Sequence, residues 1–251
     1  MTVGRRNKML RRPPMAAPEL SIVVPAYNEA NKVCATLTAI VTYLRERGSS
    51  FEIVVVADGD DGTLERAREF ASSAGTNVRV VGSTARRGKG RGVREGVAMS
   101  SGRVIGFLDA DNKTPIEEIE KLLPWLEDGY DVAIGSRAMA DSSVEIAQPL
   151  HRRVGSKAFG VAMHLAIGLR DIRDTQCGFK FFRGPVARVL FSRQRIDGYM
   201  FDVEILHLAK RHGYRIKEVG VRWSDDADSR LQLLSGNWRN AIDILRIRLN
   251  R

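Results

Sequence analysis

The stretch LSIVVPAYNEANKVCATLTAIVTYLRERGSSFEIVVV, residues 20–56, decides the fold. It opens with an apolar run at residues 20–25 and closes with a second one at residues 51–56, both rich in Val and Ile. Continuous runs of this kind are typical of strands that are buried on both faces. Between them, apolar residues recur with helical spacing, namely Val33, Leu37, Ile40, Val41 and Leu44. The stretch therefore predicts a β-α-β unit with two parallel strands.

The same alternation continues along the first half of the chain. Further strand-like runs occupy residues 77–81, 103–108 and 131–134. Repeated units of this kind imply an α/β fold with a mostly parallel central sheet flanked by helices. Such sheets bind ligands beyond the carboxyl ends of their strands. We therefore expect the functional residues at positions 25–29, 57–63, 109–111 and 135–137.

After about residue 138 the pattern changes. A basic, amphipathic stretch at residues 151–169 is followed by a predicted helix at residues 201–212 and a strand-like alternation at residues 214–223. The chain shows no internal repeat and no linker. We divide it into a basic arm at residues 1–18, a single globular domain at residues 19–236 and a basic C-terminal helix at residues 237–251.

The composition of the 251 residues restricts the class of protein. A hydrophobic share of 43% excludes disorder, and two cysteines, Cys34 and Cys177, cannot frame a disulfide scaffold. No run reaches the roughly 18 apolar residues that a membrane span needs, and the N-terminus lacks the apolar core of a signal peptide. We therefore expect a cytoplasmic protein that is not integral to a membrane.

The net charge of +10 is concentrated at the two ends of the chain. Residues 1–12 carry five basic side chains and no acidic one, and residues 239–251 carry four arginines and one aspartate. Eight of the ten excess positive charges thus lie in these two segments. No nucleic-acid-binding motif accompanies them, so no nucleic-acid partner is expected. Solvated tails and attraction to an anionic membrane surface are both consistent with this charge.

The most informative polar motif is Asp109-Ala-Asp111, directly after an apolar run. Two carboxylates at a strand end can both reach a hard divalent cation, which prefers oxygen ligands and retains positions for phosphate oxygens. The alternative is that they cap the next helix. That helix has its own start signal, with Thr114 as N-cap and Pro115 as first helical residue. The pattern therefore favours a site for a metal and a diphosphate.

A second acidic cluster, Asp58-Gly-Asp-Asp-Gly-Thr63, follows the second strand-like run. It does not match a calcium-binding EF-hand loop, because Gly62 stands where an oxygen ligand is required. It fits a plain turn in which Thr63 caps the next helix. It equally fits a carboxylate that accepts hydrogen bonds from a nucleotide base or ribose.

A basic loop, Arg86-Arg-Gly-Lys-Gly-Arg-Gly-Val-Arg94, contains five cationic side chains in nine residues. It is not a Walker A loop, because Gly90 follows Lys89 where Ser or Thr is required. It predicts a flexible, cationic approach to a helix N-terminus, which favours anions. A solvated loop is the alternative. Together with Asp109 and Asp111, the loop suggests a diphosphate held from two sides.

In combination, these motifs resemble those of the family 2 glycosyltransferases with the GT-A (Rossmann-like) fold, in the group that uses dolichyl or polyprenyl phosphate. The matching pieces are Val24-Pro-Ala-Tyr-Asn-Glu29, the Asp58 cluster, Arg87-Gly-Lys-Gly90, Asp109-Ala-Asp111, Gly135-Ser-Arg137, Asp174-Thr-Gln-Cys-Gly-Phe-Lys180 and Phe201-Asp-Val-Glu204. They span residues 20–224. The motif at residues 174–180 most resembles the dolichyl-phosphate β-glucosyltransferase branch, and dolichol-phosphate mannosyltransferases are the next group.

The resemblance implies roles by position. The nucleotide site would be lined by Pro25, Ala26, Tyr27, Glu29 and Asp58. Lys89 would approach the diphosphate, and Asp109 and Asp111 would work with Mg²⁺ or Mn²⁺. The acceptor phosphate would meet Arg137, Arg152, Arg153 and Ser156. Asp174 would be the base for a neutral acceptor or would order the acceptor loop.

Three features depart from the family pattern. The loop at residues 57–61 is one residue shorter than usual, and Lys113 stands where mannosyltransferase relatives often place Gln. The membrane-spanning helices common in the group are absent from the sequence. Two alternatives therefore stay open: a glycosyltransferase with a soluble acceptor, and a non-catalytic protein that binds a nucleotide sugar or an anionic surface.

The resemblance implies an inverting transfer of a hexose from a nucleotide sugar, UDP-glucose before GDP-mannose, to a polyprenyl or dolichyl phosphate. A phosphate monoester is already anionic at neutral pH, so it needs alignment more than a general base. Contact with the membrane would be peripheral, on its cytoplasmic face. Residues 151–169 combine basic and apolar side chains in the way an interfacial helix does.

Overall fold

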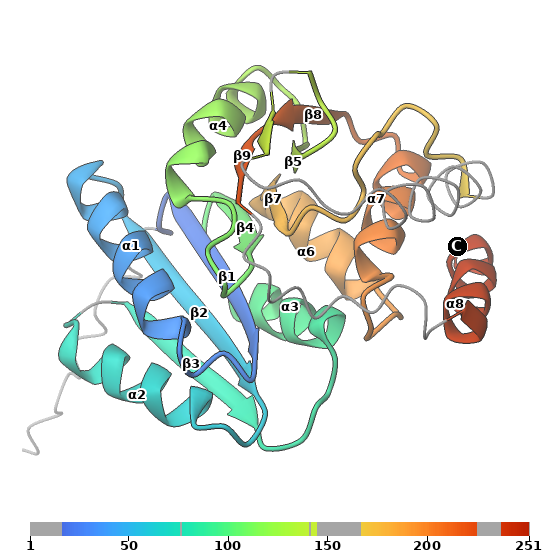
Figure 1. Ribbon diagram of the computed structural model, residues 1–251. Helices are drawn as coiled ribbons and strands as arrows, with labels where there is room; N and C mark the ends of the chain where they lie inside the picture. Colours follow the sequence, from blue (N-terminus) through green and yellow to red (C-terminus); the bar gives the residue numbers. More distant parts are fainter. Residues whose placement is uncertain (1–16, 76, 141, 145–166, 225–236, 251) are drawn as a thin grey trace, which may run out of the picture.

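The computed structural model describes residues 17–75, 77–140, 142–144, 167–224 and 237–250 (Figure 1). Seven strands form one sheet in the order β3-β2-β1-β4-β7-β5-β8. Its strands are β1 (Leu20–Tyr27), β2 (Phe51–Asp58), β3 (Val78–Ser83), β4 (Val104–Leu108), β5 (Val132–Ser136), β7 (Phe179–Arg183) and β8 (Ile216–Gly220). A second, two-stranded sheet pairs β6 (Ser143–Val144) with β9 (Arg222–Trp223).

Helices cover both faces of the large sheet (Figure 1). One layer contains α1 (Val33–Glu46), α2 (Thr63–Ser73), the 3₁₀ turn η1 (Ile116–Glu118) and α4 (Ile119–Glu127). The other contains α3 (Lys89–Ala98), α6 (Gly184–Ser192) and α7 (Phe201–Arg211), with α8 (Asn237–Leu249) against α7. The prediction of a mostly parallel sheet between two helical layers is confirmed.

The two faces explain the unbroken apolar strands. Along β1, Ile22 and Val24 belong to the core under α1 and α4, whereas Val23 belongs to the core under α3 and α7. Successive side chains of a strand point to opposite faces, so a strand covered on both sides is apolar at most of its positions. The parallel pairs β1–β2, β2–β3 and β1–β4 bring the carboxyl ends of these strands to one edge.

The strand β7 is an element that the sequence pattern did not indicate. It runs antiparallel between β4 and β5, so the sheet is mixed. Because β7 runs in the opposite direction to β4 and β5, it begins where they end. The segment before Phe179 therefore lies at the carboxyl ends of β4 and β5. Residues 174–178 therefore lie at the same edge as the Asp109 turn.

Several predicted boundaries were wrong in detail. Thr114 caps no helix: Pro115 has an extended backbone and precedes the 3₁₀ turn η1, which has no side-chain cap. The alternation at residues 214–223 forms two short strands in different sheets, β8 and β9. The arm at residues 1–16 and the amphipathic stretch up to residue 166 lie outside the described residues.

In the part of the chain that the structure describes, no helix combines the length and the apolar character that crossing a bilayer requires.

Candidate active site

The loops after β1 and β2 are fastened to one another at the carboxyl edge. The backbone amide of Asn28 donates to the Asp58 carbonyl at 3.3 Å, and that of Glu29 donates to Thr63 Oγ1 at 2.8 Å. Asn28 has a φ of 53°, in the left-handed region, and a side chain at Gly59 would collide with its amide oxygen. The hydrogen bonds and the close approach give the loops a fixed shape before any ligand arrives.

The side chains expected to line the nucleotide site differ in their access to solvent. Ala26 is buried in the core and Pro25 is half-buried, so the Ala26 side chain is closed to a ligand. Tyr27 is exposed, and the guanidinium carbon of Arg86 lies 4.8 Å above its ring. Glu29 is half-buried beside α2. Tyr27 and Arg86 thus offer a flat, cationic surface at the end of β1.

The acidic cluster after β2 divides into distinct roles. Asp58 is buried and accepts hydrogen bonds from the Arg87 amide at 3.1 Å and from its guanidinium at 2.9 and 3.1 Å. Asp61 accepts from the amides of Thr63 and Ala30, at 3.0 and 3.1 Å, and so ties the start of α2 to the loop after β1; the N-cap of α2 is Gly62. Thr63 is therefore the first residue of the helix rather than its cap. Asp60 is exposed.

The glycines of the basic loop serve close packing, which corrects the expectation of a flexible approach. Gly88 has a φ of 104°, and a side chain there would collide with the Asp197 carbonyl. A Cβ atom at Gly90 would lie 2.6 Å from that of Phe201. The side-chain amide of Gln194 donates to the Gly90 carbonyl at 2.8 Å. Because α3 begins at Lys89, these contacts fix the position of that lysine.

The two aspartates after β4 are brought together, as predicted, and each faces a lysine. Lys89 Nζ lies 2.6 Å from Asp109 Oδ1, and Lys113 Nζ lies 3.7 Å from Asp111 Oδ2. The Thr36 hydroxyl of α1 donates to the Ala110 carbonyl at 2.7 Å and so fixes the turn to α1. Burial alone would lower the pKa of Lys89, but the negative charges of Asp109 and Asp202 outweigh it and raise that pKa. Lys89 is therefore a permanent cation at neutral pH.

This turn has the chemistry of a cation site. Burial and then the charge of Asp109 raise the pKa of Asp111, so a divalent cation beside it would stabilise its charged form. Asn112, with a φ of 55°, adds a buried side-chain oxygen that has no hydrogen-bond partner within the described residues. No set of three His, Cys, Asp or Glu side chains among those residues forms a metal-ligating group. Two carboxylates would leave positions of a hard cation open to phosphate oxygens.

Across the edge, Arg137 after β5 is paired with Asp174. The Asp174 carboxylate accepts from the Arg137 amide at 3.0 Å, from Nε at 2.7 Å and from Nη2 at 2.9 Å. Burial would raise the pKa of Asp174, but the charge and hydrogen bonds of Arg137 lower it to about 2. Glu218 of β8 accepts from the backbone amides of Arg173 and Asp174, at 2.9 and 2.8 Å. The pair is therefore held by three separate segments.

Trp223 joins the two sides of the site and was not singled out from the sequence. Its ring lies 5.7 Å from Lys113 Nζ and 5.4 Å from the guanidinium carbon of Arg137. Its neighbour Arg222 donates to the buried Glu118 carboxylate, at 2.5 Å from Nε and 3.1 Å from the amide. The one available signal was its place at the end of a strand-like alternation, where site residues gather.

The family model for glycosyl transferase family 2 matches residues 21–191, which include the loops, the Asp109 turn and the Arg137–Asp174 pair. The chain belongs to glycosyl transferase family 2. The resemblance drawn from the motifs is thereby confirmed.

Several curated relatives of this family 2 glycosyltransferase are named dolichyl-phosphate beta-glucosyltransferase. It is 35% identical to the dolichyl-phosphate beta-glucosyltransferase of Drosophila melanogaster over 228 residues, covering 85% of this chain and 69% of that protein. It is 33% identical to the protein of the same name from Saccharomyces cerevisiae over 248 residues, covering 92% of this chain and 74% of that protein. The human protein of that name is 32% identical over 244 residues, with 92% and 75% covered.

Among solved structures, glucosyl-3-phosphoglycerate synthase from Mycobacterium tuberculosis resembles this family 2 glycosyltransferase. The form in complex with Mn²⁺, uridine-diphosphate and glucosyl-3-phosphoglycerate has a TM-score of 0.68 at 20% identity, and covers 93% of this chain and 80% of that one. An identity this low shows the fold alone. The fold is GT-A, as predicted.

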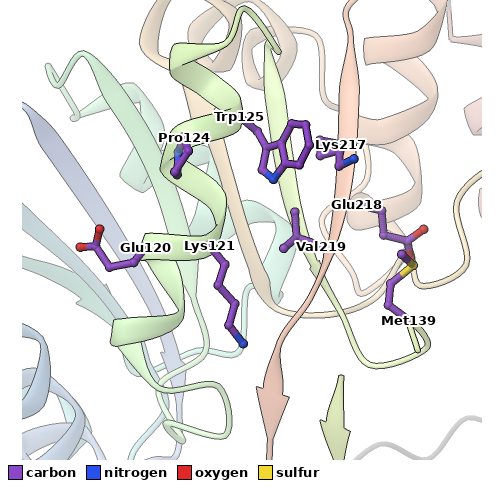
Figure 2. Close-up of a pocket in the computed structure, with 8 residues that line it drawn as sticks. All are labelled: Glu120, Lys121, Pro124, Trp125, Met139, Lys217, Glu218 and Val219. Atoms are coloured by element: carbon purple, nitrogen blue, oxygen red, sulfur yellow. The ribbon is translucent and has the colours of Figure 1, made fainter. Parts of the chain in front are cut away.

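Two cavities lie outside the group of predicted site residues of this family 2 glycosyltransferase. The first, of about 510 Å³, lies between α4 and the strand β8, and Figure 2 shows the residues that line it. There, Lys217 Nζ lies 3.7 Å from the centre of the Trp125 ring. Glu218 of this cavity is the residue that holds the backbone of Asp174. A second cavity, of about 810 Å³, lies at the amino ends of β2 and β3. Neither gathers the residues predicted for the site, and Arg152, Arg153 and Ser156 lie outside the described residues.

Proposed function

We propose that this chain is an inverting glycosyltransferase that moves a hexose from a nucleoside diphosphate sugar to a polyprenyl or dolichyl phosphate. UDP-glucose is the favoured donor, and GDP-mannose is the next. The observation that carries the proposal is the group of relatives named dolichyl-phosphate beta-glucosyltransferase, at 32–35% identity over 85–92% of the chain. The geometry supports it, because two groups of residues at the carboxyl edge of the sheet each suit a phosphate. We call them the donor side, at the end of β4, and the acceptor side, at the end of β5.

On the donor side, Lys89, Asp109 and Asp111 suit a diphosphate. Mg²⁺ or Mn²⁺ held by the two carboxylates would supply positive charge against the departing nucleoside diphosphate. Lys89, the first residue of α3, would add a second positive charge beside the diphosphate. The loops at Tyr27 and Asp60 would receive the nucleoside. The Asp58 carboxylate already holds Arg87, which supports a role in shaping this loop.

On the acceptor side, the Arg137 guanidinium suits the lipid phosphate, because its planar fork matches phosphate oxygens and its charge is permanent. The Asp174 carboxylate, with a pKa of about 2, is a weak base at neutral pH. Its contacts favour the second of the two predicted roles, namely ordering the acceptor side. A phosphate acceptor is already an anion, so no base is needed to remove a proton from it. Its attack on the anomeric carbon, from the side opposite the leaving group, would invert the anomeric configuration.

The test is a panel of UDP-glucose, GDP-mannose and UDP-GlcNAc, each with and without polyprenyl phosphate, in Mg²⁺ or in EDTA. We expect a β-linked lipid-phosphate glucose from UDP-glucose, formed only with the lipid and the cation. Transfer to a soluble acceptor would contradict the lipid acceptor and support the alternative of a soluble one. Binding of the nucleotide sugar without transfer would support a non-catalytic binding protein.

Peripheral contact with an anionic membrane is part of the proposal. On α8, Ile242, Leu245 and Leu249 are exposed beside exposed Arg246 and Arg248. Ile247 of the same helix is buried, and Asn250 donates to Glu204 at 2.6 Å, so the inner side is fixed to the body. Basic and apolar side chains on one helix suit a lipid surface. Leu245→Ser with Leu249→Ser should weaken salt-sensitive flotation with anionic vesicles, and unchanged flotation would contradict this contact.

A further inference from the structure

The helix α3, which begins with the donor-side residue Lys89, has a weak start of its own. Its N-cap is Gly88, which makes no side-chain cap hydrogen bond, and its second and fourth residues are Gly90 and Gly92. The first amides of a helix have no partner inside it, and glycine restrains the backbone least of all residues. Contacts from outside the helix must therefore set the position of Lys89.

The segment at residues 194–197 supplies a cap from elsewhere in the chain. The Arg91 amide donates to the Asp197 carbonyl at 3.2 Å, a bond that the side chain of an N-cap residue usually accepts. The side-chain amide of Gln194 donates to the Gly90 carbonyl at 2.8 Å and to a carbonyl of its own segment at 2.7 Å. The segment thus fixes the two residues that follow the donor lysine.

A buried carboxylate holds this segment in turn. Glu204, on α7, has no exposed surface and accepts from the backbone amides of Arg195 and Ile196, at 3.0 and 2.8 Å. The side-chain amide of Asn250, which follows α8, donates to it at 2.6 Å. Burying a carboxylate costs several kcal/mol, which an apolar side chain at this place would avoid. The orientation that it gives to two successive amides of the segment explains the charge.

On the basis of the proposed function, we propose that Glu204 is a positioning residue for the donor side. It aligns residues 195 and 196, so that Gln194 and the Asp197 carbonyl cap α3 and hold Lys89 where it meets the diphosphate. Without the carboxylate, the two amides lose their common acceptor, and the start of α3 loosens with the segment. The effect reaches the ligand through Lys89, which separates it from a general effect on stability.

The first test is Glu204→Gln in the full chain, with the dissociation constants of UDP and GDP measured by calorimetry in Mg²⁺. A lysine that is no longer held in place predicts affinity about tenfold weaker for the nucleotide that the protein binds. Glu52→Gln is the matched control. Glu52 is also buried and accepts from the Ser101 amide at 2.6 Å, but it lies at the amino end of β2. This control should lose stability and keep its nucleotide affinity within about twofold of wild type.

The second test is a double-mutant cycle with Lys89→Met. If Glu204 acts through Lys89, Glu204→Gln should cause no further loss of nucleotide affinity in the Lys89→Met background. A purely structural role would cause the same loss in both backgrounds. Additive losses would therefore overturn the proposal.

Hydrogen exchange tests the cap of α3 without any ligand. In Glu204→Gln, the Arg91 amide should exchange about tenfold faster than in wild type, whereas the amides of α1 should keep their rates. Gln194→Met removes the donor at the other end of the segment, so it should give the same faster exchange and the same weaker nucleotide binding.

Two outcomes separate this proposal from the proposed function. Wild-type exchange at Arg91 in both variants, or wild-type nucleotide affinity in both, would overturn the role of Glu204 alone. A wild-type protein that binds neither UDP nor GDP would instead overturn the proposed donor, and with it the purpose of the cap.

Discussion

Asp109 and Asp111, at the end of β4, lie at the same edge of the sheet as Asp174, beside β5. The two groups differ in their partners, their exposure and the direction in which their pKa is shifted. Asp109 and Asp111 each face one lysine, at 2.6 and 3.7 Å, and their side chains are 38% and 22% exposed. Asp174 is 8% exposed and accepts three hydrogen bonds from Arg137. Burial and a like charge raise the pKa of Asp111, whereas Arg137 lowers that of Asp174 to about 2.

The difference separates carboxylates that are available to a ligand from one that is already committed. An ammonium is a point charge that exchanges partners readily, whereas a bidentate guanidinium fixes both orientation and charge. The β4 turn therefore has carboxylates that can exchange a lysine for a divalent cation. The β5 side has a guanidinium oriented by its own carboxylate. We expect substitutions in the first region to affect chemistry, and those in the second to affect stability.

The largest effect is expected from Asp111→Asn. Removing one of two carboxylates for the cation should reduce metal-stimulated transfer by about 10²–10³-fold, because charge stabilisation of the leaving group is lost. The thermal midpoint should stay close to wild type or rise, since the substitution relieves repulsion with Asp109. Asp128→Asn, at the exposed end of α4, is the control. If wild type and Asp111→Asn transfer at the same rate, with or without EDTA, the proposal that this turn binds the metal would be wrong.

A smaller effect, on stability, is expected from Asp174→Asn. A carboxyl with a pKa of about 2 in the folded protein, against about 4 in the unfolded chain, stabilises the fold by about 2–3 kcal/mol above pH 5. This contribution is lost as the pH falls from about 4 toward 2, because the folded pKa is the lower one. Urea unfolding at pH 7 and pH 3.5 should therefore show a difference between variant and wild type that shrinks in acid.

The control for this prediction is Asp171→Asn, three residues away. Asp171 also forms an ion pair, with Lys210, but its side chain is 65% exposed. Exposed pairs contribute little, so the free energy of unfolding should change by less than about 1 kcal/mol. Equal losses from the two substitutions would mean that burial does not distinguish the Arg137–Asp174 pair from a surface contact.

The sequence was sufficient for the half of the fold that ends at β4. There, each strand is an apolar run, and the site residues other than Lys89 stand at or just after the end of one, so the periodicity locates both. It failed at β7, whose sequence Phe-Lys-Phe-Phe-Arg has a lysine at its second position. The lysine is tolerated because Asp202, distant in the chain, meets it in the core. Only the folded structure brings such partners together.

The site divides in the same way. Asp109, Asp111 and Lys89 carry signals of local spacing, and the structure brings them together. The Arg137–Asp174 pairing and the place of Trp223 depend on β7 and β9, which pack by long-range contacts. The glycines at 88 and 90 were misread for a related reason. Their purpose is a close approach to the segment at residues 194–201, which no local pattern indicates.

The smallest effect is expected at the point where the two regions meet. Trp223 has Lys113 of the β4 turn on one side and Arg137 on the other, at 5.7 and 5.4 Å from its ring. A cation over an aromatic face contributes about 0.5–2 kcal/mol, so Trp223→Ala should raise the KM for polyprenyl phosphate about threefold to tenfold. Trp223→Phe should recover part of the loss. Trp125→Ala is the control, because Lys217 stacks on Trp125 in the same manner outside the site. An increase in donor KM instead would assign Trp223 to the β4 turn, and an unchanged KM for both substrates would mean that the two regions act independently.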